Sequence, residues 1–61
     1  MNLKELKNEA LRLIDAYPAK SDEIREYYFL AVSEIEEGGS EVHECELAWR
    51  DMLESIEDLE M

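Results

Sequence analysis

Apolar residues recur at intervals of three and four positions in three stretches of this chain. In residues 3–17 the repeated positions are Leu3, Leu6, Ala10, Leu13 and Tyr17, and Leu11 and Ile14 widen the stripe. Such a repeat places its members on one face of an α-helix, because the helical period is about 3.6 residues. The pattern therefore predicts an amphipathic helix over residues 3–17.

Residues 22–37 and 41–60 repeat this pattern. In residues 22–37 the stripe consists of Ile24, Tyr28, Ala31 and Ile35, with Tyr27 and Val32 beside it. In residues 41–60 it consists of Val42, Cys45, Trp49, Met52, Ile56 and Leu59, flanked by Ala48 and Leu53. We expect a helix in each stretch, and the last is the longest and has the most regular heptad spacing.

Polar residues mark where these helices should begin. Asn2 is a favourable N-cap, and Glu5 lies three residues later, as a capping box requires. Ser21 and Ser40 are the expected N-caps of the second and third helices.

Proline and glycine mark where the first two helices should end. Pro18 disfavours a helical conformation at Tyr17, and Gly38 is placed to take the left-handed conformation that closes a helix. The two short connections favour antiparallel neighbours. The sequence thus predicts a single all-α domain over residues 1–61. It is either a closed three-helix bundle or a helical hairpin with an added N-terminal helix.

Three large apolar residues lie outside the predicted stripes. On a helical wheel Phe29 and Leu30 fall about 120° to either side of their stripe, and Leu47 falls nearly opposite its own. They indicate either a second apolar surface or a central helix that buries most of its circumference. Because burial in so short a chain barely offsets conformational entropy, we expect these residues to form partner contacts in a homo-oligomer.

Charge is distributed unevenly along the chain. The 61 residues include 17 Asp and Glu but 6 Lys and Arg, which gives a formal charge of −11. The second and third predicted helices carry most of this charge. Their predicted acidic surface consists of Asp22, Glu26, Glu37, Glu44, Asp51, Glu54 and Asp58. An anionic surface repels nucleic acid and anionic membranes, so we expect neither to bind directly.

The sequence favours neither an enzyme nor a metal protein. His43 and Cys45 are two positions apart and so point away from each other on a helix, and a closed zinc site needs four ligands. We expect Cys45 to be a small core residue and His43 to be solvated. The acidic, glycine-containing segment at 34–41 lacks the ligand spacing of an EF-hand. No catalytic or cofactor-binding residue is predicted.

Size and composition give the remaining expectations. A single cysteine, no signal-like N-terminus and no long apolar run are typical of a reduced, cytoplasmic protein without a membrane segment. In size and composition alone, the chain resembles the small acidic helical accessory proteins that bacterial viruses and mobile elements encode.

We expect a self-associating, non-enzymatic module for protein–protein interaction, which acts as an assembly chaperone or an inhibitor of a partner with a basic surface. The alternative is a nucleic-acid mimic that blocks a DNA- or RNA-binding protein, because the carboxylate spacing is comparable with that of a phosphate backbone.

Overall fold

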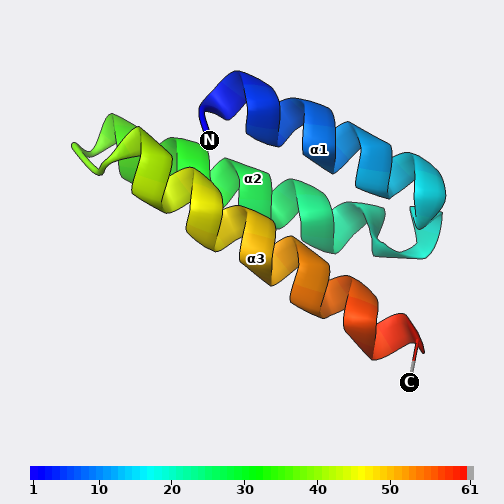
Figure 1. Ribbon diagram of the computed structural model, residues 1–61. Helices are drawn as coiled ribbons and strands as arrows, with labels where there is room; N and C mark the ends of the chain where they lie inside the picture. Colours follow the sequence, from blue (N-terminus) through cyan, green and yellow to red (C-terminus); the bar gives the residue numbers. More distant parts are fainter. Residues whose placement is uncertain (61) are drawn as a thin grey trace.

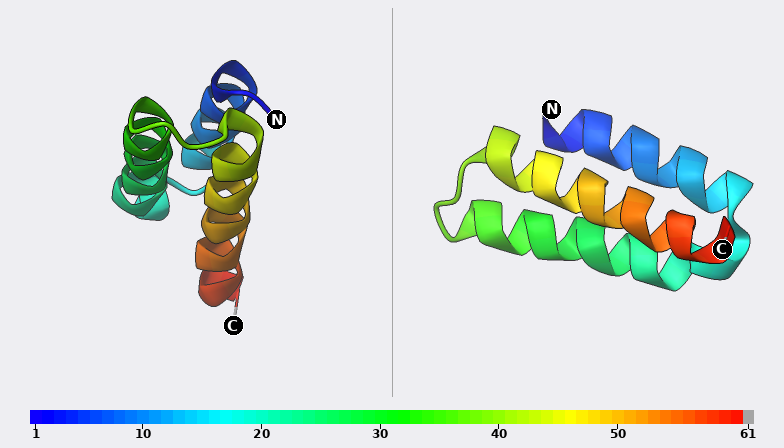
Figure 2. Two further views of the ribbon diagram at one scale, coloured as in Figure 1. Left: turned by 90° about the vertical axis from the view of Figure 1, so that its left-hand side faces the viewer. Right: turned by 60° about the horizontal axis from the view of Figure 1, so that its bottom comes forward.

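The computed structural model describes residues 1–60 as three α-helices. They are α1 (Leu3–Ala16), α2 (Ser21–Glu36) and α3 (Glu41–Glu60), with a short 3-10 helix η1 (Pro18–Lys20) between the first two (Figure 1). Each pair of α-helices is in contact. The left view of Figure 2 shows the three helices at the corners of a triangle, and Figure 1 shows the end of α3 diverging from α1. The all-α prediction is confirmed, and the contact of α1 with both other helices agrees with the predicted three-helix bundle.

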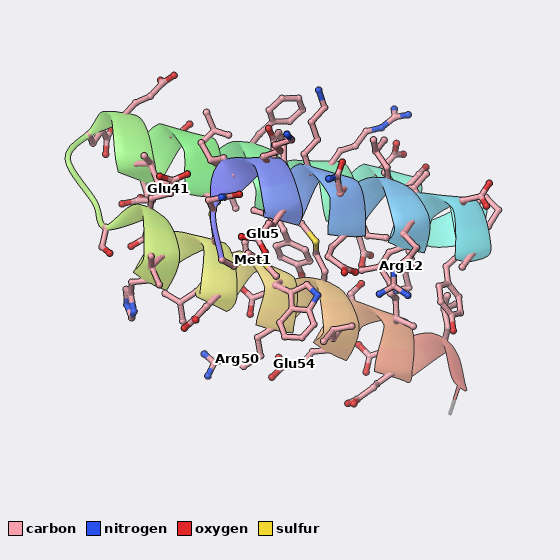
Figure 3. The ribbon with its side chains drawn as sticks, turned by 45° about the horizontal axis from the view of Figure 1, so that its top comes forward. Met1, Glu5, Arg12, Glu41, Arg50 and Glu54 are labelled. Atoms are coloured by element: carbon pink, nitrogen blue, oxygen red, sulfur yellow. The ribbon has the colours of Figure 1, made fainter. Side chains whose placement is uncertain are left out.

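The start of α1 is fixed by two sets of hydrogen bonds. The predicted capping box at Asn2 is confirmed: the Glu5 amide donates to Asn2 Oδ1 at 2.8 Å, and the Asn2 amide donates to Glu5 Oε1 at 3.3 Å. In addition, the Leu3 amide donates to Oε2 of Glu41 at 2.8 Å. Figure 3 shows the Glu41 side chain reaching from α3 towards the first turn of α1. This bond ties the starts of α1 and α3 together.

The connection between α1 and α2 differs from the prediction. Ser21 is the first residue of α2 rather than its N-cap, and Lys20 occupies the cap position without a side-chain hydrogen bond. The reason is η1: the amide of Lys20 donates to the carbonyl of Tyr17 at 2.9 Å, and that of Ser21 donates to Pro18. Because the 3-10 turn supplies acceptors for these amides, the helix begins without a polar side chain as its cap.

The end of α2 is closed by a Schellman motif at two glycines. Gly38 has φ +105°, which confirms its predicted role, and its amide donates to the carbonyl of Ile35 at 3.0 Å. The amide of Gly39 donates to the carbonyl of Glu34 at 2.9 Å. These two bonds satisfy carbonyls that the helix end would otherwise leave without donors. At the start of α3, the His43 amide donates to Ser40 Oγ at 3.4 Å, consistent with the expected cap.

The core lies where the three apolar faces meet. Its buried apolar residues are Leu6, Ala10, Leu13, Ile24, Ala31, Cys45, Ala48, Met52 and Ile56. Each helix contributes at least one alanine to this set, which lets the helix axes approach closely. The core therefore follows the predicted stripes, and the expectation that Cys45 is a core residue is confirmed.

Three residues of the predicted stripes are exposed instead. Leu11, at the edge of the α1 stripe, is 55% exposed. Val42 is 55% exposed because the first turn of α3 begins beyond the start of α1, and Leu59 is 47% exposed because the end of α3 diverges from α1 (Figure 1). Spacing along one helix carries no information about where its neighbours begin and end.

Candidate functional site

The outer face of α2 presents two large apolar side chains to solvent. Phe29 is 63% exposed and Leu30 is 54% exposed, whereas Ile24 and Ala31 on the opposite face of the same helix are buried. Phe29 and Leu30 line a shallow hollow together with residues that include Glu26. The structure thus places both residues outside the core, on a helix face that no other helix of the bundle covers.

One side of this face, which we call the α1/α2 patch, is apolar with a basic margin. It consists of Leu11 and Ile14 of α1 and Phe29 of α2, with Lys7 and Arg25 beside them. Of the described residues that line this hollow, none is acidic. The patch is therefore an unusual region of a protein whose net charge is −11.

The other side, which we call the α2/α3 groove, combines an apolar floor with an acidic rim. Leu30 of α2 and Leu47 of α3 line it from either helix, and its other lining residues are Tyr27, Ala31, Glu34, Glu44, Ala48 and Asp51. The groove has a volume of about 150 Å³. Leu47 was expected to project opposite the core, but it is half-buried, because α2 packs closely enough against α3 to cover part of it.

The predicted acidic residues fall into separate groups. Asp22 and Glu26 lie beside Phe29 and Leu30 on the outer face of α2, and Glu44 and Asp51 line the α2/α3 groove. The remaining three, Glu37, Glu54 and Asp58, are exposed. The structure therefore brings four of the seven close to the exposed apolar residues.

The ion pairs among the side chains of residues 1–59 involve none of these seven carboxylates. Arg12 Nε lies 3.0 Å from Glu9 Oε2 within α1, and Lys20 Nζ lies 3.3 Å from Glu23 Oε2. Arg50 projects away from the bundle (Figure 3). Asp22 and Glu26 share their hollow with Arg25, whereas no Lys or Arg is among the described residues that line the α2/α3 groove beside Glu44 and Asp51.

Sequence reasoning missed one polar contact between helices. Ser55 of α3 is buried, and its hydroxyl donates to Oε2 of Glu23 in the first turn of α2. This hydrogen bond, followed by the ammonium group of Lys20, lowers the pKa of Glu23 below its usual value of 4.5. Ser55 lies within the apolar pattern of the third helix. Nothing in the sequence indicates that its hydrogen-bond partner is Glu23, 32 residues earlier in the chain.

The lowered pKa of Glu23 predicts how stability depends on pH. A carboxyl whose pKa is lower in the folded state stabilises the fold above its unfolded value, and this contribution is lost as the pH falls through the folded value. Between pH 7 and pH 5, partial protonation of the many carboxylates should instead reduce repulsion and raise the melting temperature. We therefore expect the melting temperature to rise towards pH 5 and to fall below about pH 4.5.

Circular dichroism melts of the wild type and of Ser55→Ala would check this profile. The variant should lose stability at neutral pH and show a weaker decline below pH 4.5, since Glu23 no longer accepts the Ser55 hydrogen bond. Added salt at pH 7 should also raise the melting temperature, because it screens the same repulsion. A melting temperature that falls steadily from pH 7 to pH 5 would contradict this account.

Cys45 and His43 lie in different environments. Cys45 is fully buried, and this burial raises the pKa of its thiol, with the carboxylates of Glu41 and Glu44 adding to the effect. His43 is exposed on the outer surface of α3. Across the side chains of residues 1–59, His, Cys, Asp and Glu do not converge in a group of three that could hold a metal ion. A buried neutral thiol is a poor nucleophile.

A further hollow lies between the N-terminus and α3. It is lined by residues that include Met1, His43, Trp49 and Arg50. The indole Nε1 of Trp49 is buried and has no hydrogen-bond partner among the described residues. Trp49 packs against the core, so its contribution is apolar contact, as expected from its heptad position.

Comparison with protein family models, curated proteins and solved structures finds no match to this chain. Within residues 1–60, none of the helices is sufficiently long and apolar to cross a membrane. The exposed apolar residues and the charges that surround them are therefore the features of the chain that bear on its function.

Proposed function

We propose that this chain is a non-enzymatic, self-associating module that binds a partner protein and acts as an assembly chaperone or inhibitor. The observation that carries the proposal is the exposure of Phe29 and Leu30 next to each other on α2. Scattered single apolar residues are ordinary on a protein surface, whereas a contiguous patch favours an interface. Leu11 extends the exposed apolar surface across to α1.

Charge favours the α1/α2 patch as the surface for self-association. Two copies of a chain with a charge of −11 repel each other, and most carboxylates lie on α2 and α3. No acidic residue is among the described residues that line the patch, whereas Lys7 and Arg25 do line it, so an interface there brings fewer carboxylates together than one on α3. The exposed Phe29 supplies the largest apolar side chain of such an interface.

The acidic groups supply recognition of a basic partner. Complementary charge speeds the encounter between partners and selects against partners of the wrong sign. The alternative, mimicry of nucleic acid, needs carboxylates arranged on an open surface. Glu44 and Asp51 instead border a groove whose floor is apolar, which supports a protein partner over a mimic of phosphates.

Sedimentation equilibrium over a range of protein concentrations tests the self-association. We expect a mass above the 7.2 kDa of one chain for the wild type and a mass close to 7.2 kDa for Phe29→Ser. Leu59→Ser is the matched control, because Leu59 is also exposed but lies near the end of α3, away from the patch. It should associate as the wild type does. A wild type that stays monomeric at every concentration would refute the self-association.

A further inference from the structure

The apolar floor of the α2/α3 groove is partly exposed to solvent, so a partner that covers it would bury apolar surface. Leu30 is 54% exposed, and Leu47 of α3 is half-buried. Below them lie the buried Ala31 and Ala48, whose small side chains leave the depression between the helices. Its volume of about 150 Å³ is well below the range of about 300–1,000 Å³ that is usual for small-molecule sites, so it suits a side chain of a larger partner.

Three carboxylates border this floor without a cation from the chain. Glu44 and Asp51 are half-buried, and Glu34 is exposed. In the part of the chain that the structure describes, the cations that form ion pairs are Arg12 and Lys20, and neither lines the groove. Arg25 and Arg50, which α2 and α3 carry, line other hollows.

These carboxylates restrict what can cover the groove. A purely apolar partner would remove water from Glu44 and Asp51 without replacing their hydrogen bonds, and burial of an unpaired charge is strongly unfavourable. A nucleic acid would add negative charge, and a second copy of this acidic chain would add more carboxylates than cations. A lysine or arginine side chain covers the apolar floor and also pairs with the carboxylates, because its aliphatic stem packs on apolar surface while its charged end meets carboxylates.

We propose that the α2/α3 groove binds a basic amphipathic helix of a partner protein, with its apolar residues on Leu30 and Leu47 and its cations against Glu44 and Asp51. This inference rests on the proposed function and specifies the chemistry of the partner.

The spacing along α3 defines the sequence pattern of that partner. Glu44 and Asp51 are seven residues apart, which corresponds to roughly 10 Å along a helix, and Leu47 lies between them. A helix that packs alongside α3 therefore matches this arrangement with arginines seven positions apart and leucines midway between them. The same residues in another order would not place cations and leucines in register.

A pair of synthetic peptides tests the proposal. The first is a helical peptide with arginines at positions i and i+7 and leucines at i+3 and i+4, and the second has the same composition with the arginines and leucines exchanged. Isothermal titration with the full chain should show binding of the first peptide that is at least about tenfold tighter than binding of the second, equivalent to about 1.4 kcal/mol. Equal affinities would overturn the proposal, because they would indicate attraction by net charge alone.

Two double variants of equal net charge distinguish peptide binding at the groove from attraction by the net charge of the chain. Glu44→Gln with Asp51→Asn removes two groove carboxylates, and Glu46→Gln with Glu57→Gln removes two exposed carboxylates elsewhere on α3. The groove variant should weaken the binding of the first peptide by about tenfold or more, and the control should change it by less than about twofold. Similar losses in both variants would refute a specific site.

Leu30→Ser tests the apolar floor, and Phe29→Ser separates this proposal from self-association. Leu30→Ser should weaken peptide binding without unfolding the bundle, because the side chain is largely exposed. Phe29→Ser should abolish self-association and should affect peptide binding less than Leu30→Ser does, because Phe29 does not line the groove. If Leu30→Ser instead abolishes self-association and the first peptide does not bind, then a second copy occupies the groove. In that case the proposed self-association stands, and the inference about a basic partner is wrong.

Discussion

Replacing Ile24 with alanine is expected to remove a large part of the free energy of unfolding. Ile24 is fully buried in the core of the bundle. Truncation of such a side chain costs about 2–5 kcal/mol, because it removes apolar burial and leaves a cavity. At 0.05–0.15 kcal/mol per residue, a chain of 61 residues has a total stability of roughly 3–9 kcal/mol. The loss is therefore a large part of the whole free energy of unfolding, and the variant should unfold at a much lower denaturant concentration than the wild type.

Leu30→Ala provides the matched control on the same helix. Leu30 is 54% exposed, so its truncation removes little buried surface, and we expect a change within about 1 kcal/mol. Chemical denaturation followed by circular dichroism at 222 nm, a wavelength that reports helix, would measure both variants at equal protein concentration. Equal losses of stability in the two variants would mean that α2 is oriented differently from the structure.

The second large effect is expected at the turn between α2 and α3. A Cβ atom added at Gly39 would lie 2.8 Å from the carbonyl oxygen of Glu34 and 3.3 Å from Cγ of Glu44. The first contact involves backbone, which cannot move without breaking the hydrogen bonds that close α2. We expect Gly39→Ala to destabilise the protein by about 1–3 kcal/mol.

Gly38→Ala should also be destabilising, for a different reason. Its Cβ would have open space, but a φ of +105° costs an L-amino acid about 1–3 kcal/mol. Glu37→Ala, one residue earlier, has an ordinary φ of −83° and should be neutral or slightly stabilising, since it removes a carboxylate near the C-terminal end of a helix. Denaturant midpoints of the three variants would check that both glycine substitutions are destabilising and that Glu37→Ala is not. A Gly39→Ala variant as stable as the wild type would show that the turn has another conformation.

The fold was predictable because its determinants are local. The apolar period, the capping box at Asn2 and the glycine at position 38 each act within a few residues, and the predicted helices agree with the structure to within one residue at each end. The exposure of Val42 and Leu59 was not predictable, because it depends on how far α1 extends along α3. The 3-10 helix at Pro18–Lys20 also replaced the expected serine cap by supplying backbone acceptors.

The exposed residues of the candidate site were predictable from the sequence, because exposure also follows from position on a single helix. A helical wheel places Phe29 and Leu30 away from the core stripe, and the structure exposes both. The pairing of Leu30 with Leu47, and of both with Glu44 and Asp51, requires the relative rotation of α2 and α3, which one helix alone does not determine. The hydrogen bond between Ser55 and Glu23 also depends on the relative rotation of α2 and α3, so neither helix alone predicts it.

An amide chemical-shift map tests most directly whether the exposed apolar residues bordered by carboxylates form the binding face. The uniformly ¹⁵N-labelled chain would be titrated with the peptide that carries arginines at i and i+7. We expect the largest shifts on residues around Leu30, Leu47 and Asp51, and small shifts along the face of α1 that lies away from α2. Shifts spread evenly over all the acidic residues, or concentrated around Trp49 and Met1, would contradict this expectation.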